Sequence, residues 1–208
     1  MGDEDAQSPV SLKGDSIDTT LRSPDVDYEG FFRFLLDKVL TACYSSLYMR
    51  TVDIRNYREA QVTNEYYDAV VSVIEHANVE FGHPRHVVEI MGDYSKMNAE
   101  WAGRGDNNFV PKKAQFERIL KFVNTLPENA KILVHCAAGI SRSTATGLGI
   151  LANEGWDETK AVQHLVNKHP QDRAFWPNDI ILGHFDEILG TDLESAARGK
   201  AHVGKAYA

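Results

Sequence analysis

The stretch Val134–Ser143, with the sequence VHCAAGISRS, has the pattern of a junction between a strand and a helix. An apolar run over residues 132–134 leads into it, and a run compatible with a helix extends over residues 143–153. Between the two, Cys136 stands six positions before Arg142. This order predicts a strand, a tight loop and a helix, with the cysteine where the strand enters the loop.

A loop of this kind is suited to binding a phosphate-like dianion, because its backbone N–H groups and the positive end of the following helix converge on one point. The helix dipole and Arg142 both favour the thiolate of Cys136, which is the nucleophilic form. Gly139, midway along the loop, relieves steric strain where the chain turns most sharply. The sequence therefore predicts a phosphoryl-transfer site that works through a covalent cysteine intermediate.

The Cys-x5-Arg spacing alone is a weak signal, but the string His-Cys-x-Ala-Gly-x-Ser-Arg-Ser over residues 135–143 is specific. It resembles the cysteine-dependent protein tyrosine phosphatase superfamily, above all its compact dual-specificity branch and the bacterial tyrosine-phosphatase-like relatives. The resemblance implies an α/β fold with a central mixed sheet flanked by helices. It also implies that the catalytic loop follows the C-terminal end of a strand.

Each residue of the loop has a predicted role. Cys136 is the expected nucleophile, and the planar guanidinium of Arg142 is expected to hold two oxygens of the phosphate, as a lysine could not. Ser143 is placed to donate a hydrogen bond to the sulfur, or alternatively to cap the first turn of the helix. The remaining phosphate contacts are expected from the backbone N–H groups of Ala137, Ala138, Gly139, Ile140, Ser141 and Arg142.

Two polar residues are predicted to support the loop. His135 adjoins the cysteine, but neighbouring residues of a strand point to opposite faces, so we expect it to orient the loop rather than to act as a base. Asn178, in the run Trp176-Pro177-Asn178, resembles the family's Pro-Asn pair at the start of a late helix. It is expected to cap that helix, with a role in positioning the loop or a water as the alternative.

The reaction also needs a general acid, which in the family is an aspartate on a loop after another strand. Asp93 follows the predicted strand Val87–Met91 and lies 43 residues before Cys136, a longer spacing than the family's usual one. Asp106 lies 30 residues before Cys136, which fits the spacing but not the strand. We favour Asp93, because strand position fixes where a side chain reaches whereas loop length varies, and treat residues 98–108 as an insertion.

The loop interior carries no lysine or histidine, which relatives acting on multiply phosphorylated molecules tend to have there. This absence favours a phosphomonoester on a protein side chain: phosphotyrosine first, with phosphoserine or phosphothreonine if the pocket is shallow. Two alternatives stay open. One is a non-protein substrate such as a phosphoinositide, an inositol phosphate or an RNA 5′-phosphate, and the other is a non-catalytic module that binds phosphoproteins.

Composition narrows the class of protein. The 208 residues are 43% hydrophobic with a net charge of −8, which predicts one globular domain and argues against nucleic-acid binding. No stretch is apolar enough to span a membrane, so a cytoplasmic protein without membrane partners is expected.

Cys43 and Cys136 are too few for a multi-cysteine metal site, and neither a metal nor another cofactor is expected. Cys43 is predicted to be core, with an oxidative disulfide to Cys136 as the alternative. The oligomeric state is left open.

The chain is predicted to consist of three parts: a flexible acidic tail over residues 1–26, a catalytic domain over 27–192 and a flexible C-terminal tail over 193–208. Within the domain, buried strands alternate with amphipathic helices, which indicates an α/β layered fold. The predicted strands are Tyr48–Ile54, Ala69–Ile74, Val87–Met91 and Lys131–His135. The predicted helices are a segment over Phe31–Leu40, one containing Phe116–Val123, one over Ser143–Asn153, one after Asp157, and a last one that stops at Gly190.

Overall fold

The structure is a computed structural model, and it describes residues 29–34, 36, 49–76, 81–98 and 109–200. The chain divides into two compact units, Met1–Ala42 and Cys43–Ala208. In the first unit, residues 29–34 and 36 are helical, as predicted for part of Phe31–Leu40. The predicted tail over residues 1–26 lies outside the described residues, as do Cys43 and Asp106.

The second unit is built on a four-stranded sheet whose strand order is β1-β4-β2-β3. Every pair of neighbouring strands is parallel, so the described strands form a parallel sheet where the sequence led us to expect a mixed one. All four strands were predicted, with ends displaced by no more than three residues. They are β1 (Thr51–Asn56), β2 (Ala69–Ile74), β3 (His86–Ile90) and β4 (Lys131–Cys136).

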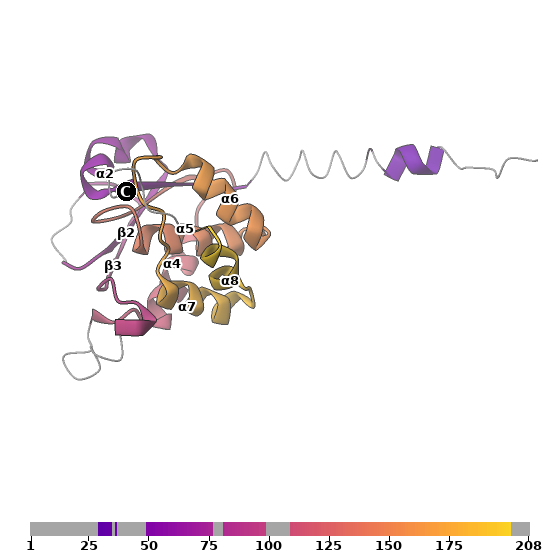
Figure 1. Ribbon diagram of the computed structural model, residues 1–208. Coiled ribbons are helices and arrows are strands. Elements are labelled where there is room, and N and C mark those ends of the chain that lie inside the picture. Colours follow the sequence, from indigo (N-terminus) through magenta and orange to yellow (C-terminus); the bar gives the residue numbers. More distant parts are fainter. Residues whose placement is uncertain (1–28, 35, 37–48, 77–80, 99–108, 201–208) are drawn as a thin grey trace, which may run out of the picture. The chain divides into compact units, whose positions relative to one another are not determined.

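Helices cover both faces of this sheet (Figure 1). Helix α5 packs on β1, β4 and β2 and is itself flanked by α4, α6 and α7. Helix α2 packs on β1 and β4. The helical elements are α2 (Tyr57–Thr63), the 3-10 turn η1 (Asn64–Tyr66), α4 (Lys113–Val123), α5 (Arg142–Asn153), α6 (Glu158–Lys168), α7 (Asp179–Leu189) and α8 (Leu193–Arg198).

The hydrophobic core consists of two clusters, and successive side chains of β4 belong to one cluster or the other. Ile132 and Val134 belong to the large cluster that holds the buried faces of α4 to α7, whereas Leu133 packs with Ala60 of α2 and Val70 of β2. Because both faces are covered, a central strand is apolar throughout rather than at alternate positions. All six residues of β2 are buried accordingly.

The helix boundaries follow predicted capping signals. The side chain of Asp157 accepts a hydrogen bond from the Lys160 N–H at the start of α6. Asn178 does the same at the start of α7, for the N–H groups of Ile180 and Ile181. At the other end of α7, Gly190 adopts a left-handed conformation with φ of 70°.

The C-terminal boundary of the folded part lies further along the chain than predicted. Residues 193–198, expected within a flexible tail, form α8, which packs on α6 and α7. Leu193 and Ala197 are buried in the large core cluster. Because the segment consists mostly of small and polar residues, the sequence interpretation overlooked two apolar positions four residues apart, which lie on one face of a helix. No helix in the described part of the chain is long and apolar enough to cross a membrane.

Candidate active site

The carboxyl ends of the parallel strands meet at one edge of the sheet, which is where open α/β sheets place their sites. The central strand β4 ends at Cys136. Neighbouring strands β2 and β3 are followed there by Glu75 and Asp93, and β1 is followed by Tyr57. The topology thereby brings together residues that are far apart in the sequence.

The loop after Cys136 is held from outside through its carbonyl oxygens. Those of Ala137, Ile140 and Ser141 accept hydrogen bonds from the backbone N–H groups of Tyr57, Trp176 and Asn178, at 3.2, 3.2 and 3.3 Å. In a planar trans peptide the next N–H points the opposite way from the carbonyl. The N–H groups that follow these carbonyls therefore point away from the outer contacts, toward the inside of the loop, as an anion-binding nest requires.

Gly139 occupies a position that only glycine fits. Its φ is 73°, a conformation that disfavours side chains, and a Cβ there would lie 2.9 Å from both the Arg55 carbonyl carbon and the Asn56 nitrogen. These atoms are backbone and cannot move aside. The loop consequently passes close to the end of β1, which helps to fix its shape.

The sulfur of Cys136 lies at the floor of the loop and is almost enclosed, since the residue is 2% exposed. The Gly139 N–H donates a hydrogen bond to Sγ at 3.2 Å, and the Ser143 hydroxyl oxygen lies 3.2 Å from the same atom. Both contacts stabilise charge on sulfur when the N–H and O–H donate. The expected contact between Ser143 and the sulfur is thus present in the geometry.

The side chain of Arg142 is buried beside the loop, with the residue 4% exposed. Its Nη1 donates to the Met91 carbonyl oxygen at 2.8 Å, and its Nη2 lies 3.3 Å from Oε1 of Glu75. The buried Nε has no hydrogen-bond partner among the described residues. A buried guanidinium that retains an unused donor is suited to receive an anionic oxygen.

Asp93 lies at the mouth of the loop, as predicted from its place after β3. Its Oδ1 accepts hydrogen bonds from the Ser141 hydroxyl at 2.6 Å and from Asn178 Nδ2 at 2.9 Å. Both contacts fall on the same oxygen, and Oδ2 has no partner within the described ranges. The carboxyl group is therefore oriented by two donors on one oxygen, while the other oxygen is unpaired among the described residues. Asp106, the alternative acid, lies outside the described residues.

Asn178 contacts the segment of Asp93, the loop at Ser141 and the first turn of α7. Besides capping α7, its Nδ2 donates to Asp93 and to the Tyr94 carbonyl oxygen, the latter at 2.8 Å. Its backbone N–H binds the loop at Ser141. The cap that the sequence predicts is confirmed, and the same residue also contacts Asp93 and the loop, as its alternative role would require.

His135 points to the opposite face of β4 from the sulfur, toward Ser72 and Phe81. Its Nε2 lies 2.5 Å from the Ser72 hydroxyl, which lies 2.7 Å from Nε2 of His86. The pKa of His135 is lowered to about 4, because burial, with a smaller effect of the His86 charge, outweighs a backbone hydrogen bond with Cys136 that raises it. A neutral ring engaged in this buried chain fits the predicted orienting role.

The sequence interpretation missed several of these supporting residues. Ser72 is the one polar residue in the apolar run AVVSVI of β2, and that exception was a signal for a buried hydrogen bond. Glu75 and Met91 gave no local signal, because their contacts to Arg142 depend on which strands are neighbours.

Two cavities adjoin the loop. One, of about 510 Å³, is lined by residues that include Tyr57, Glu75, His76 and Arg142. The other, of about 390 Å³, is lined by Asn56, Ala137, Ala138, Ile140, Asp172 and Arg173, and Arg58 lines both. Among the described residues, no cluster of three or more His, Cys, Asp or Glu side chains could hold a metal ion.

Comparisons with known proteins give a likeness in structure only. No family model and no curated protein sequence matches the chain. The crystal structure of Tk-PTP in the active form is similar over 71% of this chain and 92% of its own, with 19% identity and a TM-score of 0.47. The PTP-2 phosphatase of Cydia pomonella is similar over 67% and 83%, with 19% identity and a TM-score of 0.43. TpbA of P. aeruginosa is similar over 72% and 85%, with 12% identity and a TM-score of 0.37. At these identities and TM-scores the likeness carries no functional argument, and the function has to be argued from the site itself.

Proposed function

We propose that the protein is a cysteine-dependent phosphatase that removes phosphate from phosphotyrosine in proteins, with phosphoserine and phosphothreonine as further substrates. The observation that carries the proposal is the joint placement of three groups. The Cys136 sulfur accepts a hydrogen bond from the loop N–H of Gly139, the buried Arg142 ends the loop with its Nε unpaired among the described residues, and Asp93 binds the loop at Ser141 through one oxygen only. A nucleophile, an anion clamp and an acid are the groups that phosphoryl transfer needs.

In the first step, the thiolate of Cys136 attacks phosphorus in line, so that an S–P bond forms as the bond to the leaving oxygen breaks. Asp93 gives the leaving oxygen a proton from Oδ2, because Oδ1 is occupied by two donors. Arg142 and the loop N–H groups stabilise the equatorial oxygens, on which negative charge is spread in the transition state.

In the second step, water attacks the phosphocysteine. The Asp93 carboxylate takes a proton from the water as the new O–P bond forms and the S–P bond breaks. The electron pair returns to sulfur, where the Gly139 N–H and the Ser143 hydroxyl stabilise the departing thiolate. Inorganic phosphate leaves and both groups regain their starting protonation states.

The charges around the loop favour a single phosphate on a protein. In the larger cavity Arg58 and Arg142 are accompanied by Glu75, and in the smaller one Arg58 and Arg173 are accompanied by Asp172. Arg173 is also paired with Glu59 at 2.8 Å. A site for several phosphates would need a larger excess of positive charge than this lining has, since its three arginines are accompanied by two carboxylates. We expect the enzyme to act in a reducing compartment such as the cytoplasm, since oxidation would consume the thiolate.

The test is phosphate release, without added metal, from matched phosphotyrosine, phosphoserine, phosphothreonine and phosphoinositide substrates. We expect wild type to turn over phosphotyrosine, and Cys136→Ser to lose at least about a thousand-fold in rate. Arg142→Lys should lose about a hundred-fold or more in kcat as well as binding more weakly. Cys43→Ser, which removes the other thiol, is the control and should retain the wild-type rate.

Three results would contradict the proposal. Turnover that survives Cys136→Ser would exclude the thiolate mechanism. Turnover of the lipid alone would move the substrate class to phosphoinositides. Binding of phosphopeptides by freshly reduced wild type with no turnover of any substrate would identify a non-catalytic module.

A further inference from the structure

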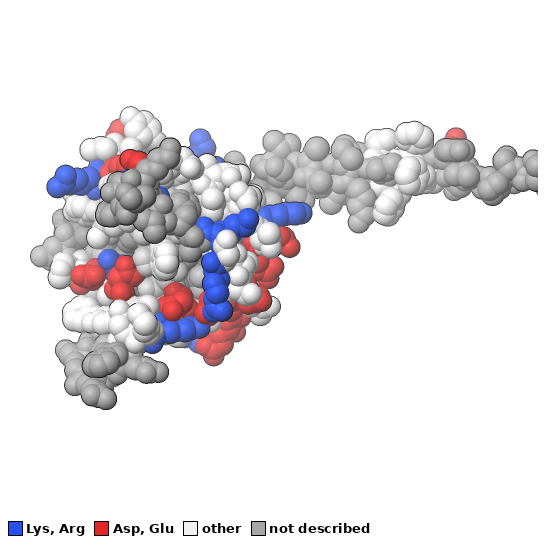
Figure 2. Space-filling view, viewed as in Figure 1, with Lys and Arg blue, Asp and Glu red and all other residues white. Residues whose placement is uncertain are grey.

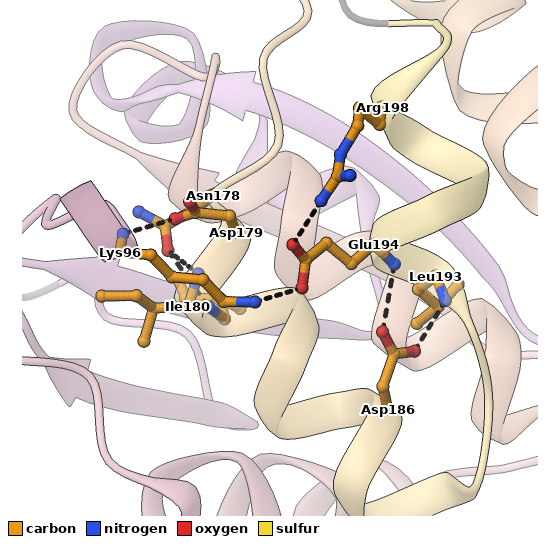
Figure 3. A network of polar contacts seen from close by, with 9 residues as sticks. Lys96, Asn178, Asp179, Ile180, Asp186, Leu193, Glu194 and Arg198 are labelled. Atoms are coloured by element: carbon orange, nitrogen blue, oxygen red, sulfur yellow. Dashed lines mark hydrogen bonds and ion pairs between the residues drawn. The ribbon is translucent and has the colours of Figure 1, made fainter.

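The segment Gly92–Asn98, which carries Asp93, is attached to α7 and α8 at several points (Figure 3). Asn178 binds the Tyr94 carbonyl oxygen, as described above. The Lys96 backbone N–H donates to Oδ1 of Asp179 at 3.0 Å. Beyond these contacts, the Lys96 ammonium group forms an ion pair with Glu194 of α8. The segment that carries Asp93 is therefore attached to α8 as well, through the contact of Lys96 with Glu194.

Glu194 is itself fixed in place by α7. The carboxylate of Asp186 accepts hydrogen bonds from the backbone N–H groups of Leu193 and Glu194, at 2.6 and 3.0 Å (Figure 3). It also accepts one from the Thr191 hydroxyl at 2.7 Å. Since Leu193 is fully buried, the first turn of α8 is held both by polar contacts and by the core. Glu194 thus extends from a rigid support.

The charge on Glu194 is maintained by its neighbours. Burial raises the pKa of Glu194, but hydrogen bonds and charges from Lys96 and Arg198 outweigh this effect and lower it overall. Arg198, one turn further along α8, donates to the other carboxylate oxygen at 2.9 Å. Acidic and basic side chains adjoin over the part of the surface where α7 and α8 lie (Figure 2). The carboxylate is consequently bound by two cations, one from its own helix and one from the segment of Asp93.

The ion pair lies across α7 at Gly183. A Cβ on this residue would be 3.7 Å from Lys96 Nζ and 3.9 Å from Glu194 Oε2, so the pair rests on the helix surface in ordinary contact. The Lys96 side chain is 55% exposed and that of Glu194 21%. An ion pair with this exposure contributes little to global stability. Its influence is expected instead on the local equilibrium of the segment that it attaches.

We propose that Glu194 is a positioning residue for the general acid, holding the segment of Asp93 against α7 and α8 through Lys96. This inference rests on the proposed function, in which Asp93 protonates the leaving oxygen. When the pair is broken, Asn178 and Asp179 still hold the segment, but the carboxyl group spends less time in the geometry required for proton transfer. α8 thereby contributes to catalysis without touching the substrate.

The test compares two substrates that differ in their need for an acid. Phosphotyrosine releases a weakly acidic phenol, whereas an aryl phosphate with a strongly acidic phenol, such as a dinitrophenyl phosphate, leaves without protonation. Because Asp93 also activates water in the second step, which both esters share, the comparison is made on kcat/KM, which reports only the formation of the phosphocysteine. We expect Glu194→Gln to lower kcat/KM on phosphotyrosine by about five-fold, and to leave kcat/KM on the dinitrophenyl ester within about two-fold of wild type. Lys96→Gln should behave in the same way, and the double variant should lose no more than either single variant.

The matched control is Glu187→Gln. It removes another surface ion pair of α7, that of Glu187 with Lys113 of α4 at 2.8 Å, and should change the rate on neither ester. An equal loss on both esters, or no loss on either, would overturn the inference, as would additive losses in the double variant. Failure of the proposed function is separate, because it would appear as phosphate release that survives Cys136→Ser. Thermal unfolding of each variant verifies that the comparison is made on folded protein.

Discussion

At the scale of single residues, His135 links the site to the pH dependence of folding. Its pKa is lowered to about 4 by burial, from an ordinary value of 6.5, so the folded state resists protonation that the unfolded chain accepts. The stabilisation is complete above the unfolded pKa and is lost as the pH falls toward the folded one. Between about pH 7 and pH 4.5 we expect this residue to account for about 2 kcal/mol of lost unfolding free energy, measured by urea denaturation.

The variant His135→Asn isolates this contribution. It removes the titrating ring, so its unfolding free energy should fall less steeply over the same pH interval, even if the variant is less stable at neutral pH. His76, which is exposed, provides the control, and His76→Asn should keep the wild-type slope. Parallel curves for wild type and His135→Asn would refute the prediction.

The site residues that could be predicted from the sequence are those with a local signal. Cys136, Gly139 and Arg142 share one loop between a strand and a helix, so their spacing alone brings them together. Asp93 could be placed because it follows a strand, although its role is still a proposal. The contacts of Ser72 with His135 and of Glu75 with Arg142 could not be predicted, since each joins residues more than sixty positions apart. Such contacts depend on the order of strands in the sheet, which no local pattern encodes.

At the scale of elements, the packing of α5 against α7 depends on Gly149. A Cβ there would lie far inside van der Waals contact with the ring of Phe185, which is fully buried and has no space to retreat. Alanine is the better helix former by about 1 kcal/mol, but overpacking of a buried contact costs about 1 to 3 kcal/mol. We expect Gly149→Ala to lower the free energy of unfolding, as measured by chemical denaturation.

Gly183 of α7 supplies the matched comparison, because a Cβ there meets nothing closer than 3.7 Å. Gly183→Ala should be neutral or stabilising by up to about 1 kcal/mol. If both variants were stabilised alike, helix propensity would dominate, and the prediction that a side chain at Gly149 overpacks against Phe185 would be wrong.

The same scale shows why strands were easier to predict than α8. The central strands β2 and β4 contain the apolar runs Ala69–Val71 and Ile132–Val134, and a parallel sheet covered on both faces requires such runs. Helix α8 has six residues, of which Leu193 and Ala197 are buried. Two buried positions in a short segment cannot be distinguished from a frayed terminus until the surface that they cover is known.

At the scale of the whole molecule, the boundary between the two units predicts which part of the chain suffices for folding and activity. The buried hydrophobic residues of the described chain run from Val52 to Ala197, and all of its described strands lie in the unit that begins at Cys43. We therefore expect a fragment over residues 43–208 to unfold within about 3 °C of the full chain and to keep its phosphatase rate. The positive control is Leu193→Ala in the full chain. It removes a buried side chain, should lower the free energy of unfolding by about 2 to 4 kcal/mol, and verifies that calorimetry detects the loss of core packing. A fragment that unfolds well below the full chain, while one over residues 27–208 does not, would show that residues 27–42 complete the catalytic domain, as the sequence alone had suggested.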